Sequence, residues 1–89
     1  LRRQDNQKWY AALLTVSKNK IGLSGDEKIE IVDLRLPPEE MAQTVDNHKY
    51  FPGYHMNKKH WYTICLDGSV EPVELYQRLD LSYKLAKKK

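Results

Sequence analysis

The sequence predicts a small α+β fold in which helices cover one face of an antiparallel-rich sheet, as a two-layer sandwich. The chain has 89 residues, of which 40% are apolar and 30% charged, as expected for one globular domain with a modest core. Its apolar residues form short strand-like runs, and two segments that follow prolines show helical spacing. The expected order is strand, strand, helix, short strand, strand, helix.

The first two expected strands cover residues 9–16 and 28–36. The run at 9–16 is almost continuously apolar and starts with two aromatic residues, which favours a strand buried on both faces over a helix. In the second strand the apolar residues change face between Ile31 and Val32. We therefore expect a bulge there, or burial on both sides of the sheet.

Glycines and prolines mark where the chain turns. Residues 22–25 contain two glycines and are expected to form a turn with positive φ angles. Pro37 and Pro38, followed by two acids, begin the first expected helix, because proline fits a first helical turn and acids suit the positive end of the helix dipole. This helix should end near Asn47.

Two further strands and a second helix complete the expected fold. A short strand is expected at 54–56 and a clear one at 61–66, which ends in a turn formed by Asp67 and Gly68. The final helix is expected over residues 72–87. Its apolar stripe consists of Tyr76, Leu79, Tyr83 and Ala86, with Leu75 beside them.

Basic residues are concentrated in one part of the chain, although the net charge of +3 is mild. Residues 48–61 contain three lysines, three histidines and no acid, whereas residues 27–46 carry six acids and two bases. Basic groups interleaved with aromatic rings can contact phosphates and stack on bases. This segment predicts a binding surface, and the sequence makes no good case for an enzyme.

Other classes of function find less support. No apolar run is long enough to span a membrane, and we expect no cofactor. The single cysteine, Cys65, excludes an internal disulfide and favours a reducing cytoplasm. In mid-strand a thiol is normally a small buried hydrophobe and not a nucleophile.

One interpretation of His55 and His60 is that they bind a metal ion. They lie five residues apart, and no cysteine or acid is close enough in sequence to complete a ligand shell. We therefore expect no metal ion, and instead two imidazoles that form hydrogen bonds in a turn between two strands.

One string is specific enough to indicate a family, and it runs Pro52-Gly53-Tyr54-His55-Met56-Asn57-Lys58-Lys59-His60-Trp61. Together with Thr63 and residues 66–69, it resembles the signature of the MmcQ/YjbR family of small bacterial proteins. Residues 6–11, 20–23 and 81–83 also resemble that family, so the likeness runs along essentially the whole chain.

The resemblance implies a fold of the type III secretion chaperone-like class: helix, three strands, helix, two strands, helix. Family members normally have a helix and a strand start before the position of Leu1, so we expect residues 1–89 to be one domain cut short at its N-terminus. The family has no established biochemical function, and the resemblance carries over no catalytic residue. The family is often described as DNA-binding, by fold comparison with a double-wing DNA-binding domain.

We therefore expect a non-enzymatic, cytoplasmic bacterial domain that binds nucleic acid, with duplex DNA as its partner. The residues expected to contact it are Tyr54, His55, Asn57, Lys58, Lys59, Lys18 and Lys20. Trp61 and Tyr62 are expected in the core. Two alternatives remain: a protein-interaction domain with exposed apolar surface, and a small-ligand pocket lined by Tyr54, His55 and Trp61.

Overall fold

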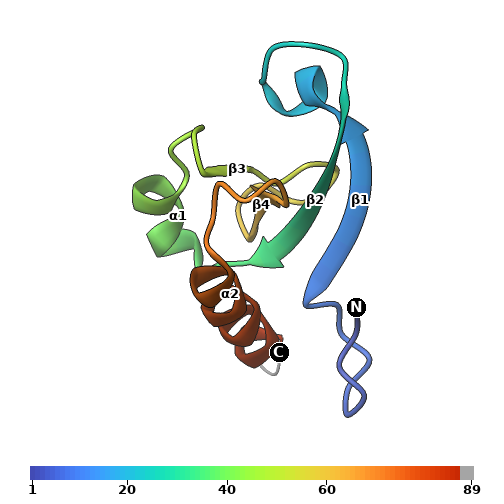
Figure 1. Ribbon diagram of the computed structural model, residues 1–89. Helices are drawn as coiled ribbons and strands as arrows, with labels where there is room; N and C mark the ends of the chain where they lie inside the picture. Colours follow the sequence, from blue (N-terminus) through green and yellow to red (C-terminus); the bar gives the residue numbers. More distant parts are fainter. Residues whose placement is uncertain (87–89) are drawn as a thin grey trace.

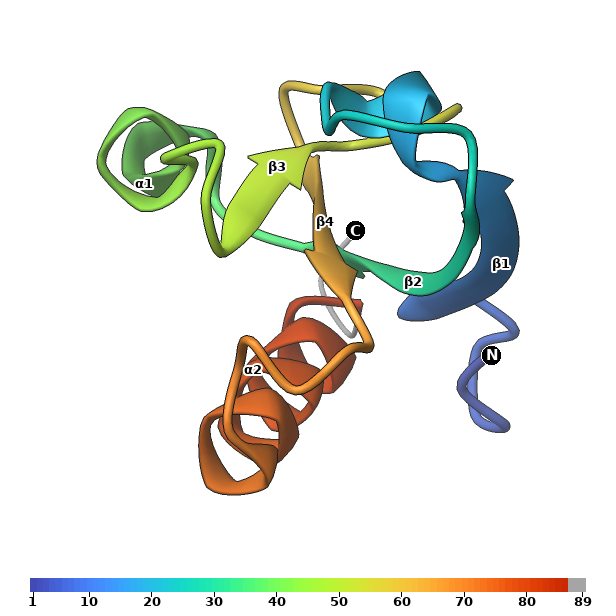
Figure 2. The same ribbon diagram turned by 45° about the horizontal axis from the view of Figure 1, so that its top comes forward.

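A computed structural model describes residues 1–86 as a four-stranded antiparallel sheet with two helices packed on one face (Figures 1 and 2). The strands lie in the order β1-β2-β4-β3, so that β2 and β4 are central. This confirms the predicted α+β sandwich and its order of elements. The elements are β1 (Ala11–Ser17), the 3₁₀ helix η1 (Lys18–Ile21), β2 (Lys28–Arg35), α1 (Pro38–Thr44), β3 (Tyr50–Pro52), β4 (Trp61–Cys65) and α2 (Pro72–Leu85).

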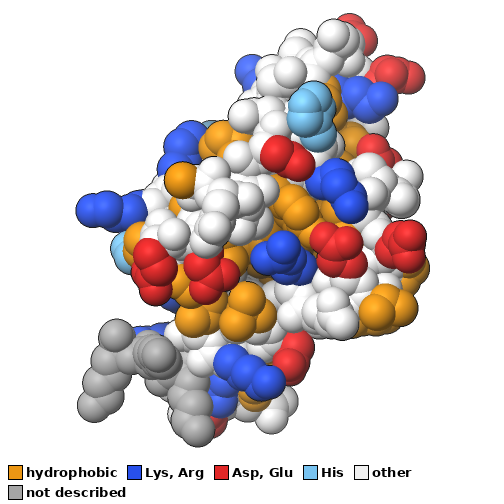
Figure 3. All heavy atoms as spheres, turned by 90° about the vertical axis from the view of Figure 1, so that its left-hand side faces the viewer, with side chains coloured by type: hydrophobic (Ala, Val, Ile, Leu, Met, Phe, Trp, Pro, Cys, Tyr) orange, Lys and Arg blue, Asp and Glu red, His pale blue; other side chains and the backbone are white. Residues whose placement is uncertain are grey.

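The main apolar cluster lies between the sheet and the helices. Val32 and Leu34 of β2 meet Tyr62 and Ile64 of β4 there, because side chains two residues apart share one face of a strand. Both helices pack against this cluster, and the side chains that they add are Met41 from α1 and Leu75, Leu79 and Leu81 from α2. Figure 3 shows the side that carries α1, where acidic and basic side chains are interspersed around apolar ones.

A second apolar cluster covers the opposite face of the sheet. It consists of Val16, Ile29, Ile31, Phe51 and Cys65. The change of apolar phase in β2 is thus explained by burial on both faces, and β2 keeps a continuous register with β4 from Ile31 to Arg35. Loops cover this second face: Ile21 and Leu23 come from the η1 segment, and Tyr54 from the β3–β4 connection.

The prediction that the first strand is buried on both faces is wrong. Leu13, in the middle of β1, is 61% exposed. The reason is that β1 is an edge strand, and α2 packs chiefly on β2. A continuous apolar run does not reveal whether its strand lies at the centre or the edge of a sheet.

Two predicted boundaries between residues 44 and 56 are also wrong. The first helix ends at Thr44, before Asn47, because Asp46 Oδ1 accepts the backbone N–H groups of His48, Lys49 and Tyr50 and forms a turn. The short strand lies at Tyr50–Pro52 and pairs with β4, whereas residues 54–56 form a turn. His55 has φ 58°, which an extended strand does not allow.

Helix α2 begins at Pro72 as predicted and ends at Leu85. Lys87, the last predicted helical residue, lies outside the described residues with Lys88 and Lys89. The predicted apolar stripe is wrong at Tyr76, which is 68% exposed. The face that packs inward instead contains Leu75, Leu79, Ser82 and Ala86.

Ser82 fastens α2 to the sheet. Its fully buried hydroxyl donates to the backbone oxygen of Tyr10 at 2.5 Å and accepts the backbone N–H of Arg35 at 2.8 Å. Because this buried hydroxyl both donates and accepts a hydrogen bond, it links α2 to the backbone at Tyr10 and at Arg35.

Replacing Ser82 with alanine should lower the free energy of unfolding by about 1–3 kcal/mol, because two buried backbone groups lose their partner. Denaturant unfolding measures the loss. The exposed Ser24→Ala change is the matched control and should be close to neutral. Equal losses in the two variants would contradict the role of Ser82.

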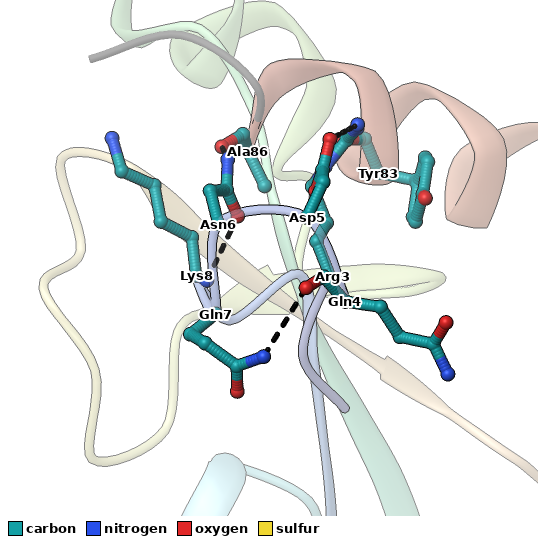
Figure 4. A network of polar contacts seen from close by, with 8 residues as sticks. All are labelled: Arg3, Gln4, Asp5, Asn6, Gln7, Lys8, Tyr83 and Ala86. Carbon is teal, nitrogen blue, oxygen red and sulfur yellow. Dashed lines mark hydrogen bonds and ion pairs between the residues drawn. The ribbon is translucent and has the colours of Figure 1, made fainter.

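The first ten residues form a tight hairpin that caps the end of α2 (Figure 4). A terminal guanidinium nitrogen of Arg3 donates to the carbonyl of Tyr83 at 2.7 Å, and the Asn6 amide donates to the carbonyl of Ala86 at 3.0 Å. These groups satisfy carbonyls that a helix end leaves unpaired, and the cation suits the negative end of the dipole. None of the helices within residues 1–86 combines the length and apolar character needed to cross a bilayer.

Candidate functional site

The predicted basic–aromatic segment forms a loop over the helix-free face of the sheet. We call residues Gly53–His60 the cationic loop; they connect β3 to β4. Its Tyr54 packs on the second apolar cluster together with Ile21 and Leu23 of the η1 segment. The fold therefore brings Lys18 and Lys20 to the same face of the sheet as the cationic loop, as the sequence-based hypothesis requires.

The cationic loop is fastened to the sheet through Thr63 in the middle of β4. Thr63 Oγ1 accepts the backbone N–H of Tyr54 at 3.0 Å and donates to Asp33 Oδ1. The ammonium group of Lys58 donates to the carbonyl of Gly53 at 3.1 Å, across the base of the loop. The loop backbone is thus held in place by hydrogen bonds to the side chains of Thr63 and Lys58.

Asn57 shapes the tip of the cationic loop. Its backbone oxygen accepts the N–H groups of His60 at 3.1 Å and Trp61 at 3.0 Å, and its side-chain oxygen accepts the N–H of Lys59 at 2.8 Å. This is a turn in which asparagine stabilises the backbone locally. Asn57, which was expected to contact nucleic acid, therefore has a structural role in holding this turn.

Gly53 allows the loop to pass directly over β4. A Cβ atom at this position would lie 2.8 Å from the backbone oxygen of Trp61 and 3.0 Å from its Cβ. Since backbone atoms of a central strand cannot move aside cheaply, only glycine fits this approach. The Pro-Gly pair in the sequence therefore marks a close contact as well as a turn.

The loop directs its cations to solvent. His55, Lys58 and Lys59 are exposed, as is Lys20 on the η1 segment. Lys18 is half-buried and forms an ion pair with Glu27 at 3.5 Å, which offsets part of its charge. Lys59 and Lys20 are exposed on this face and form no ion pair with the described residues.

Tyr54 is less accessible for contact with nucleic acid than the sequence suggested. It is half-buried and packs on the second cluster, and its ring centroid lies 4.1 Å from that of His55. Trp61 and Tyr62 are buried, which confirms their predicted place in the core. Stacking on this face would fall mainly to the imidazole of His55.

The two histidines of the loop have different neighbours. His55 contacts Tyr54, whereas His60 lies beside Arg35 at the border of an open hollow. Within residues 1–86 neither imidazole forms a side-chain hydrogen bond, contrary to the expected pair of hydrogen-bonded rings. Across the same residues, no three His, Cys, Asp or Glu side chains come together in a way that would hold a metal ion.

Asp33 lies buried in β2, next to Thr63 on the face that the cationic loop covers. Burial raises the pKa of its carboxyl to about 6, against the opposing effects of the Thr63 hydrogen bond and the charges of His55 and Lys58. Its Oδ2 atom has no hydrogen-bond partner among the described residues. A signal in the sequence was available, since Asp33 stands between Val32 and Leu34 in an apolar strand.

Arg35, at the end of β2, also had no predicted role. Its Nε atom donates to the backbone oxygen of Trp9 at 2.6 Å, and its guanidinium carbon lies 4.8 Å from the ring centroid of Trp61. Burial lowers the pKa of Arg35 from its ordinary value. The hollow beside Arg35 and His60 has a volume of about 450 Å³.

The fold and this site define a class: a small α+β domain with a fastened cationic loop over the helix-free face of its sheet. Comparison with known families agrees, because the YjbR family model matches residues 3–85. The chain therefore belongs to the YjbR family.

Relatives and solved structures support this assignment. The chain is 37% identical over 87 residues to the uncharacterised protein YyaQ of Bacillus subtilis (strain 168), covering 98% of this chain and 74% of that protein. It is 38% identical over 56 residues to the uncharacterised protein YjbR of Escherichia coli (strain K12), covering 62% of this chain and 48% of that one. The chain thus matches about half the length of this second relative.

Two solved structures of a Pseudomonas syringae protein share the fold. The crystal structure has a TM-score of 0.91 at 36% identity and covers 96% of this chain and 73% of that one. The solution NMR structure has a TM-score of 0.82 at the same identity and covers 96% and 68%. These matches confirm the predicted fold class and the family resemblance.

Proposed function

We propose that this chain is a non-catalytic binding domain that contacts the phosphates of duplex DNA through the cationic loop. The observation that carries the proposal is a cationic surface on a backbone that is already ordered. Residues 47–66 contain no acid, and Thr63 and Asn57 hold the loop that displays its lysines. An ordered loop loses little conformational entropy when it binds.

The contacts differ in kind along the loop. Lys59 and Lys20 supply phosphate contacts, because their ammonium groups are exposed. Lys58 contributes charge from a position set by its bond to Gly53, and His55 adds a ring and a proton donor. Asn57 acts by holding the turn, and Tyr54 by anchoring the loop to the sheet.

Charge reversal in the loop tests the proposal. Fluorescence anisotropy of a labelled duplex of about 30 base pairs, titrated at low and moderate salt, measures the affinity and its salt dependence. Lys59→Glu should weaken binding about tenfold, and Lys58→Glu with Lys59→Glu should weaken it further. Each lost phosphate contact should reduce the salt slope by about one.

Lys84→Glu is the matched control. Lys84 lies on α2, which packs on the opposite face of the sheet, and its replacement changes the net charge by the same amount. We expect its effect to be much smaller than that of Lys59→Glu. Equal losses would show that net charge and not the loop governs binding, and no binding at low salt would exclude DNA as the partner.

The proposal includes a cytoplasmic location. It is compatible with the lone Cys65, which is buried in β4 with a pKa raised by burial and therefore keeps its thiol protonated and unreactive. A binding role needs no activated nucleophile, and the buried thiol of Cys65 is poorly placed to act as one.

A further inference from the structure

A hollow lies beside the cationic loop, where β2 leaves the sheet towards α1. Arg35 and His60 line it from adjacent strand ends, which the hydrogen bond from the Leu36 N–H to the His60 carbonyl (2.9 Å) holds together. Lys8 of the N-terminal hairpin lines it as well, and Glu39 of α1 is the one acid that lines it among residues 1–86. Arg35 and His60 thus bring nitrogen donors from two segments to one hollow.

Arg35 is held in place with part of its guanidinium group available. Its Nε atom is fixed on the Trp9 carbonyl, and its plane lies over the Trp61 ring. Neither of its terminal nitrogens donates a hydrogen bond within residues 1–86. A fixed guanidinium whose two terminal nitrogens can both donate matches the two oxygens of a carboxylate or phosphate group.

The other residues that line the hollow indicate the chemistry of the rest of the ligand. Leu36, Pro37, Pro38 and Leu85 add apolar lining to the hollow. A volume of about 450 Å³ is larger than one oxyanion needs and lies within the range of small-molecule sites. The lining therefore suits a compact apolar group that carries one anionic head.

We propose that this hollow binds a small organic anion, whose carboxylate or phosphate group contacts Arg35 and His60 and whose apolar body lies against Pro37 and Pro38. This site is separate from the loop tip that carries Lys59. The proposal does not depend on DNA binding.

Nuclear magnetic resonance titration of the ¹⁵N-labelled chain tests the proposal, with phenyl phosphate, benzoate and inorganic phosphate as separate probes. We expect saturable shifts of the Arg35 Nε–H signal and of the Leu36 and His60 amides. Stronger binding of phenyl phosphate than of inorganic phosphate would show that the apolar wall contributes. The comparison with benzoate distinguishes a phosphate from a carboxylate head.

Two variants with opposite expected effects make the test sharp. Arg35→Gln should weaken binding about tenfold or more, because it removes the charged donors. Glu39→Gln should strengthen binding severalfold, because it removes a carboxylate that would repel the anion, and since Glu39 is exposed the fold should survive. Lys28→Gln, at the exposed start of β2, is the matched control for loss of charge and should leave the affinity unchanged.

The outcomes separate the two proposals. If Lys59→Glu weakens DNA binding but retains the phenyl phosphate shifts, the two sites are distinct, as proposed. The small-anion site is overturned if none of the probes shifts the Arg35, Leu36 and His60 signals. It is also overturned if Glu39→Gln leaves the affinity unchanged or if Lys28→Gln weakens it as much as Arg35→Gln.

Discussion

Replacing Asp33 with asparagine is expected to raise the free energy of unfolding by about 2 kcal/mol near pH 8 and to have little effect near pH 4. Asparagine keeps an oxygen for the hydroxyl of Thr63 and removes a charge buried in β2. Denaturant unfolding at several pH values measures both stabilities. The difference between variant and native chain should grow as the pH rises from about 4 to above 6.

The sign of the expected stability change follows from the direction in which folding shifts the pKa of Asp33. The pKa of Asp33 rises from 3.8 to about 6 on folding, so the folded chain holds the proton more tightly than the unfolded chain. Below the unfolded value both states are protonated and Asp33 costs nothing. Above about 6 both are ionised, and the buried charge lowers the stability by about 3 kcal/mol at most.

The exposed Asp26→Asn change is the matched control, because it alters the same chemical group without changing a buried charge. It should leave the pH dependence of stability as it is. A loss of stability in Asp33→Asn near pH 8 would mean that the carboxylate is compensated better than its unpaired Oδ2 atom indicates. The charge of Lys58, which opposes the shift, would then be the compensating group.

Replacing Gly53 with valine is expected to lower the free energy of unfolding by about 3 kcal/mol, and alanine should cost less. The added Cβ would meet the Trp61 backbone at 2.8 Å, and the two γ carbons of valine add further overlap. The strand or the loop must move, and either movement disturbs the bond from Tyr54 to Thr63. Denaturant unfolding of the native chain, Gly53→Ala and Gly53→Val measures these differences in stability.

Gly68→Ala separates steric overlap from backbone strain. Gly68 has φ 91°, and nothing lies within 4 Å of a Cβ placed there, so its cost of about 1 kcal/mol comes from the left-handed conformation alone. Gly53→Val should cost clearly more. If the two cost the same, the close approach of Gly53 to β4 does not limit the loop.

The paired strands and the second helix could be predicted because their signals are local. The alternation in residues 28–36 and 61–66 places apolar side chains on each face of β2 and β4, and burial of Trp61 and Tyr62 follows from it. Pro72 fits the first turn of α2, where its missing N–H costs nothing. The two glycines of residues 22–25 have φ 92° and 101°, as a turn with positive φ requires.

Predictions failed where the answer depended on a distant neighbour. Leu13 and Tyr76 follow the expected apolar patterns, but their exposure depends on which strands and helices lie beside them. The short strand was predicted at residues 54–56, whereas it ends at Pro52, directly before the close contact of Gly53 with Trp61. Periodicity contains no information about such contacts.

The sequence by itself determined that this chain folds as a YjbR-type α+β sandwich and that one short segment gathers its cations without acids. Only the tertiary structure decided that Asn57 and Tyr54 hold the loop, that Asp33 is buried beneath it, and that Arg35 meets His60 at a hollow. The physical reason is the separation along the chain of the residues that determine each feature. Strand and helix patterns arise between residues a few positions apart, whereas burial, pKa and access depend on segments far apart in the chain.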